Sequence, residues 1–200
     1  MKRNEDLFEK IQTILPEISQ RAGIAEQNRE VPTKNIAALK QTGLHRIFQP
    51  QAYGGLELSL PEFTDCLVEV AGACTSTAWA FGLMCTHNYM IAHFPKQFQD
   101  EVWGENPHAT ASSSIAPFGK AEQVEGGIRF SGEFRWSSGC DHTEWAILGF
   151  HRINARGEKI HTLAVLPRKD YKIQDDWFCA GVRFSGEFRW SSGCDHTEWA

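Results

Sequence analysis

Apolar side chains recur at helical spacing through the first hundred residues. Over residues 7–18 they return every three or four positions with charged residues between them, which predicts an amphipathic helix that continues into residues 21–28 and bends at Pro16. A second helix is expected from Thr33 to Gly43, because glycine readily takes the left-handed conformation that ends a helix.

Three more helices are expected before this spacing is lost. Ser59, Pro61 and Glu62 belong to a capping-box sequence with proline in the first turn, so a helix is predicted to begin there. Residues 78–93 are strongly apolar, which indicates a helix buried on most of its circumference. Pro95 is expected to open a further short helix.

The period changes near residue 109. Apolar and charged side chains alternate over residues 128–136, as they do in a half-buried strand. Residues 146–150 and 160–166 are predicted to form two more strands, joined by a turn at residues 154–157. Helices followed by strands give an α+β fold class.

The end of the chain repeats an earlier segment. Residues 183–200 are identical, letter for letter, to residues 129–146. Repeat proteins conserve only framework positions and need about three or more copies, so this duplication is interpreted as recent or artefactual. The second copy is assigned no function, and its apolar strand is expected to lack a proper neighbour. The expected domains are therefore a helical domain over 1–108, a partial β domain over 109–182 and the duplicated 183–200.

Composition and charge narrow the class of protein. Hydrophobic residues make up 42% and charged residues 22% of the 200 residues, which is typical of a soluble globular protein. The formal net charge is −5, and lysine and arginine are scattered, so nucleic acid is not an expected partner. The sequence shows neither a signal-peptide pattern nor an apolar run long enough for a membrane span. A cytoplasmic location is expected.

The cysteines lack the tight, regular spacing of a disulfide framework, so free thiols are expected, most of them as small core residues. They are Cys66, Cys74, Cys85, Cys140, Cys179 and Cys194. The pairs Cys85 with His87 and Cys140 with His142 also lack paired zinc-ligand spacing, and no metal is expected.

Three segments combine aromatic or small apolar residues with hydroxyl groups: residues 78–87, 112–117 and 136–142. Such a combination suits a planar, hydrogen-bonding ring better than a metal or a phosphate. No Gly-x-Gly-x-x-Gly follows a predicted strand, so NADH is expected to be handled by another protein. From the residues alone, core and turn roles for the aromatic, serine and histidine side chains of these segments remain open.

The segments ASSSIAPFG, VEGGIRFSGEFRWSSGCDHTEWAILG and GLHRIFQPQAYGGLELS resemble the oxygenase components of two-component, flavin-dependent aromatic monooxygenases, the family of p-hydroxyphenylacetate 3-hydroxylase. The resemblance runs from about Ile11 to Val182, and extends more distantly to the acyl-CoA dehydrogenases. It implies an N-terminal all-α domain, then a β-barrel or sandwich domain that is incomplete here. The C-terminal helical bundle of that fold is not expected within this sequence.

The resemblance also implies a flavin site. Trp136, Ser137 and Ser138 would touch the isoalloxazine ring, with the Ser138 hydroxyl placed to bond flavin N5 and so act in catalysis. A polar group fixed there in a water-poor pocket would prolong the life of a C4a-hydroperoxyflavin. Trp79 would cover another part of the flavin, and Ser112 would line its cavity.

The implied substrate is a phenol. His87 would orient or deprotonate its hydroxyl group and so raise electron density at the ortho carbon, and Ser113 would bond the same substrate. The implied co-reactants are O2 and reduced FMN or FAD, supplied by a separate NAD(P)H:flavin reductase. A homotetramer is expected for a full-length parent. Two alternatives stay open: a flavin oxidoreductase of the acyl-CoA dehydrogenase type, and a truncated, inactive fragment.

Overall fold

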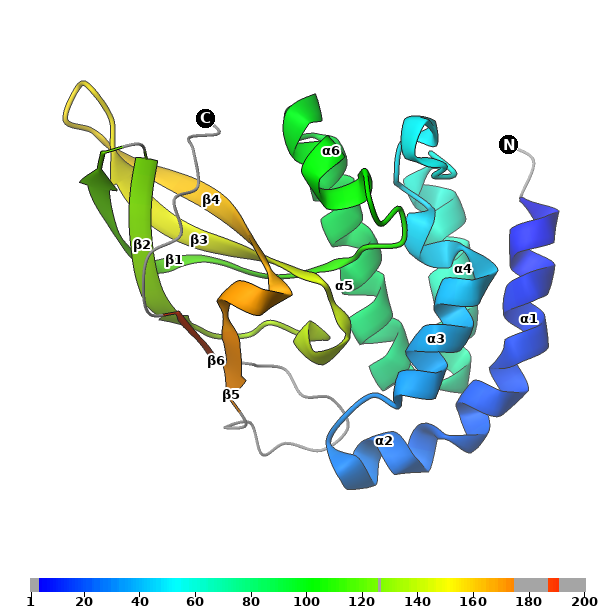
Figure 1. Cartoon of the computed structure of the whole chain (residues 1–200). Coiled ribbons are helices and arrows are strands. Elements are labelled where there is room, and N and C mark those ends of the chain that lie inside the picture. The colour runs from blue at the N-terminus through cyan, green and yellow to red at the C-terminus, as the bar shows by residue number, and fades with distance from the viewer. Residues whose placement is uncertain (1–3, 126, 175–186, 191–200) are drawn as a thin grey trace. The chain divides into compact units, whose positions relative to one another are not determined.

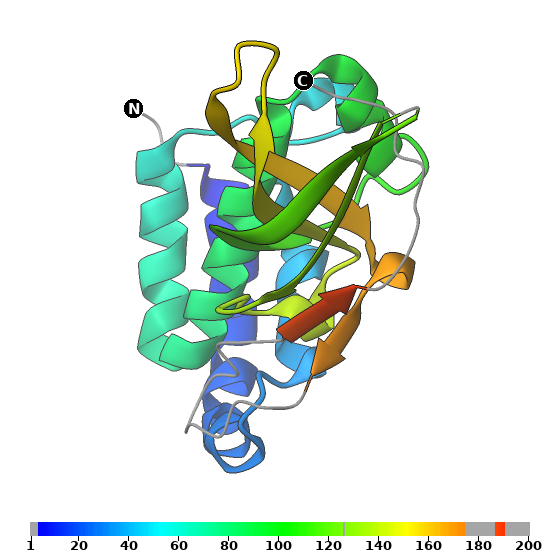
Figure 2. The same cartoon turned by 90° about the vertical axis from the view of Figure 1, so that its left-hand side faces the viewer.

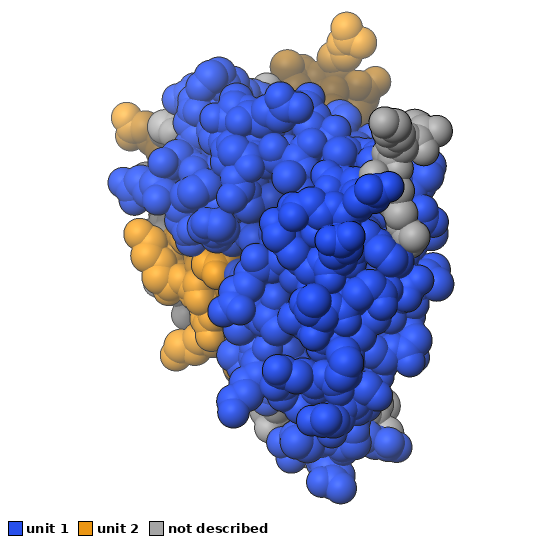
Figure 3. Space-filling model, turned by 90° about the vertical axis from the view of Figure 1, so that its right-hand side faces the viewer, with its two compact units in different colours: residues 1–110, 178–183 blue, residues 111–177, 184–200 orange. Residues whose placement is uncertain are grey.

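A computed structural model describes residues 4–125, 127–174 and 187–190, the last range by its backbone. The described residues divide into two compact units, a helical unit that extends to Thr110 and a sheet unit that begins at Ala111 (Figure 1). Figure 3 distinguishes the two units by colour. The succession of helices and then strands confirms the predicted α+β class.

The helical unit contains six α-helices within its described residues. They are α1 (Glu5–Gln20), α2 (Ala22–Asn28), α3 (Thr33–Thr42), α4 (Leu60–Ala73), α5 (Thr75–Ala92) and α6 (Lys96–Trp103). Two 3-10 turns, η1 (Leu44–Arg46) and η2 (Gln51–Tyr53), lie between α3 and α4. None of the helices in the described part of the chain is long and apolar enough to cross a membrane.

Local sequence signals place the ends of several helices. The capping box of α4 is confirmed: the Glu62 carboxylate accepts hydrogen bonds from the Ser59 backbone N–H at 3.0 Å and from its hydroxyl at 2.6 Å. Gly43 ends α3 with φ +88°, as expected. The prediction of one long first helix was wrong. α1 continues through Pro16 to Gln20, and a separate helix starts beyond Arg21.

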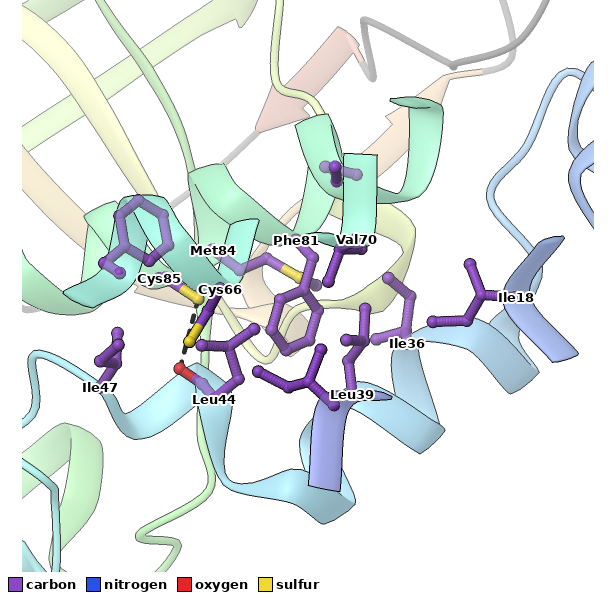
Figure 4. Close-up of a cluster of buried hydrophobic side chains, with 14 of the residues drawn as sticks. Ile18, Ile36, Leu39, Leu44, Ile47, Cys66, Val70, Phe81, Met84 and Cys85 are labelled. Carbon is purple, nitrogen blue, oxygen red and sulfur yellow. Dashed lines mark hydrogen bonds between the residues drawn. The ribbon is translucent and has the colours of Figure 1, made fainter. Parts of the chain in front are cut away.

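An apolar cluster joins four helices of the helical unit. It collects side chains from α1, α3, α4 and α5, several of which are shown in Figure 4: Ile18, Ile36, Leu39, Val70, Phe81 and Met84. The Cys85 thiol lies in this cluster and donates to the Leu44 carbonyl oxygen at 3.5 Å (Figure 4). α5 supplies ten buried residues, which confirms that this helix is covered on most sides.

The described part of the sheet unit contains six strands. They are β1 (Ala111–Val124), β2 (Gly127–Phe134), β3 (Trp145–Ile153), β4 (Lys159–Pro167), β5 (Lys172–Gln174) and β6 (Glu187–Trp190). Their order is β4-β3-β1-β2-β6-β5 (Figure 2). β1 runs parallel to β3, and every other described pair is antiparallel. Phe130, Phe134, Phe150 and Leu166 form the centre of its core.

The second copy of the repeated segment does not lack neighbours, contrary to expectation. Its described residues form β6, which pairs with β2 on one side and β5 on the other. In the first pairing Phe134 stands opposite Phe188, its own copy. A strand between two others has its backbone groups satisfied on both sides, which an unpaired edge cannot achieve. The other residues of the second copy lie outside the described range.

Four of the six cysteines, Cys66, Cys74, Cys85 and Cys140, are buried and outside any disulfide. This confirms for these four the interpretation that they are small core residues. Cys179 and Cys194 lie outside the described residues.

Candidate active site

Helix α5 carries two of the predicted site residues of the helical unit, Trp79 and His87. Trp79 is 52% exposed, whereas His87 is 5% exposed. The eight positions that separate them correspond to about 12 Å along the helix axis and about 80° around it. α5 therefore presents a broad apolar ring and, more than two turns further on, a nearly buried imidazole.

A buried polar contact next to His87 fixes α5 against η1. The Asn88 side-chain amide donates to the His45 carbonyl oxygen at 2.9 Å, and His45 Nε2 lies 3.1 Å from His108 Nδ1. Burial, followed by the nearby charges of Lys40, His108 and Arg46, lowers the pKa of His45 to about 3. His45 is therefore neutral near pH 7. The sequence patterns did not single out Asn88 or His45.

Cys85, two residues before His87, is unsuited to nucleophilic or metal chemistry. It is fully buried, and this burial together with the proximity of Cys66 raises the pKa of its thiol. A thiolate, which is the form that binds metals, is thereby disfavoured. In the part of the chain that the structure describes, no three or more histidine, cysteine or acidic side chains form a cluster that could hold a metal ion.

The serine run of the sheet unit lies at the start of β1, beside β3. Successive side chains of a strand point to opposite faces, so Ser112 and Ser114 share one face and Ser113 lies on the other. Ser112 is fully buried, and its hydroxyl has no hydrogen-bond partner among the described residues. Ser114, which was not predicted as a site residue, donates to the Arg135 carbonyl oxygen at 2.7 Å.

Trp136, Ser137 and Ser138 follow β2 after one intervening residue, Arg135. Trp136 has φ +61°, a left-handed conformation that is disfavoured for a bulky side chain, and its side chain is 58% exposed. Ser137 is fully buried, and its hydroxyl has no partner among the described residues. Ser138 is 5% exposed, and Gly139, at φ +76°, then turns the chain into a 3-10 helix. Strained residues of this kind cluster at functional sites.

The Trp136 ring forms part of an open groove of about 610 Å³ in the sheet unit. Its walls are formed by Phe118, Lys120, Ser131, Gly132, Glu133, Arg135 and Trp136. The rings of Phe118 and Trp136 lie 5.7 Å apart, centroid to centroid, and are tilted by 58°. This volume falls within the range of about 300 to 1,000 Å³ that small-molecule sites span.

These residues of the sheet unit fit a flavin ring. Ser112 and Ser137 each keep a buried hydroxyl without a partner, and leaving such a group unpaired costs about 1–3 kcal/mol. A planar ring whose edge carries N–H and C=O groups has partners of the kind that these hydroxyls lack, and an exposed indole offers a stacking surface. Neither serine is among the residues that form the walls of the groove. The Ser114 bond to Arg135 brings the serine run and the Trp136 segment together. Trp79 and His87 belong to the helical unit.

The chain also matches known proteins. The family model for the acyl-CoA dehydrogenase N-terminal domain matches residues 9–106. The oxygenase component of p-hydroxyphenylacetate 3-hydroxylase from Acinetobacter baumannii is 59% identical over 90% of this chain and 43% of that protein. The chain thus spans less than half the length of this relative.

Solved structures agree with the sequence match. The crystal structure of 3-HSA hydroxylase from Rhodococcus sp. RHA1 has a TM-score of 0.86 and 33% identity, over 93% of this chain and 49% of that one. XiaF from Streptomyces sp., in complex with FADH2 and glycerol, has a TM-score of 0.83 and 28% identity, over 92% and 47% of the two chains.

Fold and sequence point to the same class: residues 9–106 match the N-terminal domain of the acyl-CoA dehydrogenases, and the fold matches that of 3-HSA hydroxylase. The curated relatives that it matches include oxygenase components of this class: the Acinetobacter protein at 59% identity, and the oxygenase subunit of a flavin-dependent monooxygenase from Rhodococcus jostii at 36% identity over 90% of this chain and 47% of that protein. The predicted resemblance and fold class are confirmed.

Proposed function

We propose that the whole protein is the oxygenase component of a two-component, flavin-dependent monooxygenase that hydroxylates a phenol. The observation that carries this proposal is the Trp136 segment: an exposed indole on left-handed backbone beside the unpartnered, buried hydroxyl of Ser137. The 59% identity to an oxygenase component supports the same reaction class.

In this proposal, Trp136 packs against the isoalloxazine ring, and the Ser112 and Ser137 hydroxyls bond its polar edge. The Ser138 hydroxyl bonds N5 from a position that is 5% exposed, where water does not compete. Trp79 covers another part of the ring. Reduced flavin, when bound, supplies the electrons that activate O2, and the chain holds the ring in a dry, fixed orientation.

His87 and Ser113 act on the phenol. With its side chain 5% exposed, His87 holds the phenolic hydroxyl and accepts its proton, which raises electron density at the ortho carbon. Ser113 lies on the opposite face of β1 from Ser112, so the two hydroxyls serve different molecules, Ser113 the substrate and Ser112 the flavin. Catalysis by the chain then consists of orienting an activated ring.

Partners follow from the same chemistry. The name of the Acinetobacter relative, an oxygenase component, supports a separate NAD(P)H:flavin reductase as the source of reduced flavin. The FADH2 in the XiaF structure supports FAD, with FMN as the other cofactor to be compared. We place the whole protein in the cytoplasm, as a homotetramer, with O2 and a small phenol as its co-substrates.

A second candidate is a flavin oxidoreductase that acts on acyl-CoA thioesters, which the family model over residues 9–106 favours. The two candidates differ in how the flavin is reduced. An acyl-CoA oxidoreductase is reduced anaerobically by its own thioester substrate, whereas the proposed monooxygenase takes flavin that is already reduced.

The test is an anaerobic titration of the whole protein with reduced FMN and FAD, followed by mixing with O2 and a phenol. Tight binding and hydroxylated product are expected, and Ser138→Ala is expected to release more hydrogen peroxide per product, by about tenfold for a lost charge-stabilising contact. Ser19→Ala, an exposed serine on α1, serves as the control. Reduction of the flavin by an acyl-CoA thioester, without hydroxylated product, would contradict the proposal.

A further inference from the structure

Strand β1 is interrupted by a bulge beside the candidate flavin site. Its pairing with β3 shifts between Ser114 and Gly119, so residues 115–118 stand opposite the single residue Gly149. We call these four residues the bulge segment. A side chain at position 149 would overlap the Ile115 carbonyl group and come within 2.9 Å of the Ala116 carbonyl oxygen. Glycine there is what allows the bulge segment to cross β3 so closely.

A histidine on β4 fastens the start of the bulge segment. His161 Nε2 lies 2.8 Å from the Ile115 carbonyl oxygen. A carbonyl can only accept, so Nε2 carries the hydrogen and donates it. His151 stands directly opposite His161 on β3, with the ring centroids 6.0 Å apart. That neighbouring histidine provides a matched comparison.

Trp136 and the residue before it are contacted at both ends of the bulge segment, by Ser114 just before it and by Phe118 within it. At one end, the adjacent Ser114 is 4% exposed and donates to the carbonyl oxygen of Arg135, which belongs to the peptide bond that leads into Trp136. At the other end, the Phe118 ring packs against the Trp136 ring at 5.7 Å. One short segment of β1 thus contacts the tryptophan at its backbone and at its side chain.

Trp136 needs such support. Its φ of +61° is disfavoured for a tryptophan, and a disfavoured backbone persists only where the surrounding structure holds it. Burial does not provide that support, because the side chain is 58% exposed. The contacts from Ser114 and Phe118 are the ones that restrain it on the β1 side.

We infer that the bulge segment is a positioning device for Trp136, with Ser114 and His161 as its two anchoring residues. Both anchors act through Trp136 rather than on the bound ring itself. They set the angle of the indole and hence which planar ring the groove accepts. This role in binding rests on the proposed function, whereas the effect on Trp136 does not.

The test compares Ser114→Ala, His161→Ala, His161→Gln and the control His151→Ala in the whole protein. Glutamine keeps an N–H donor near the Nε2 position, so it is the conservative replacement. The first readout is near-UV circular dichroism, with the Trp136 contribution defined by subtracting the spectrum of Trp136→Phe. The second is the dissociation constant for reduced flavin. Far-UV circular dichroism checks that each variant folds.

The Trp136 signal is expected to fall in Ser114→Ala and His161→Ala and to persist in His161→Gln and His151→Ala. Affinity for reduced flavin is expected to weaken by about tenfold in Ser114→Ala, where a partly buried bond is lost, and about fivefold in His161→Ala, where the bond is exposed. A Trp136 signal that is unchanged in both alanine variants, or changed equally by His151→Ala, overturns the inference. If the signal responds as expected but no variant or parent binds reduced flavin, the positioning role stands and the proposed function fails.

Discussion

At the scale of single residues, Trp136 is held in a backbone conformation that lowers the stability of the fold. Left-handed backbone at Trp136 costs about 1–3 kcal/mol of strain. Because the side chain is half-exposed, its burial contributes little stabilisation to offset that strain. The unpartnered hydroxyls of Ser112 and Ser137 add a further cost of the same kind. The strained backbone and the unpaired hydroxyls do not stabilise the fold, and they lie where the flavin is proposed to bind.

Replacement of Trp136 by asparagine is therefore predicted to abolish flavin binding without lowering the stability of the fold. Asparagine tolerates the left-handed region, so the free energy of unfolding is expected to stay level or rise by up to about 1 kcal/mol, while affinity for reduced flavin is lost. Urea denaturation and anaerobic titration measure the two effects. Trp79→Asn, at a similarly exposed tryptophan in ordinary helix, is expected to lower stability. Equal destabilisation by both variants would argue against strain at Trp136.

His45 gives a second prediction at this scale, on pH dependence. Its pKa is about 3 in the folded chain and about 6.5 when unfolded, so the unfolded state binds the proton more readily. The stability contributed by neutral His45 is complete above pH 6.5 and is lost as pH falls toward 3, by about 2 kcal/mol at pH 5. Urea denaturation at pH 5 and pH 7 measures it. In His45→Gln this part of the pH dependence is expected to disappear, and an unchanged profile would refute the assignment.

At the scale of elements, α5 and the start of β1 hold most of the proposed site residues in place. α5 is covered by the apolar cluster on most sides and tied to η1 through Asn88, so Trp79 and His87 are carried on a rigid helix. β1 combines a regular stretch that bears the serine run with a bulge that bears Phe118. Sites carried on helices and strands hold their geometry better than sites on loops.

The duplicated segment gives the prediction at the element scale. Because β6 pairs with β2 and β5, its backbone amides are expected to exchange with deuterium slowly. Hydrogen exchange of peptides that cover residues 187–190 measures this, with the exposed turn around Gly157 as the fast-exchanging reference. Exchange as fast as in that turn would restore the original expectation that the second copy lacks neighbours.

At the scale of the whole molecule, the chain consists of a helical unit and a sheet unit that each have their own core. The serine run and the Trp136 segment, which carry most of the proposed flavin contacts, both belong to the sheet unit. The chain spans about half the length, or less, of the relatives that it matches. Activity is therefore proposed for the whole protein.

The sequence by itself determined the features that depend on near neighbours. Periodicity predicted α3, α5 and the strands after residue 127, and the Ser59 and Glu62 pair predicted the start of α4. Short motifs also carried the family resemblance, because the residues that mark it are adjacent in the chain. These signals persist without tertiary structure, since a turn of helix or two positions of a strand contain all of the information.

Only the tertiary structure decided the features that join distant residues. The parallel pairing of β1 with β3, the bulge opposite Gly149 and the bond from His161 to Ile115, 46 positions away, leave no local pattern. The φ of Trp136 and the unpartnered hydroxyls of Ser112 and Ser137 are decided in the same way. The physical reason is that strand register and the satisfaction of buried polar groups depend on partners that folding, not sequence distance, brings together.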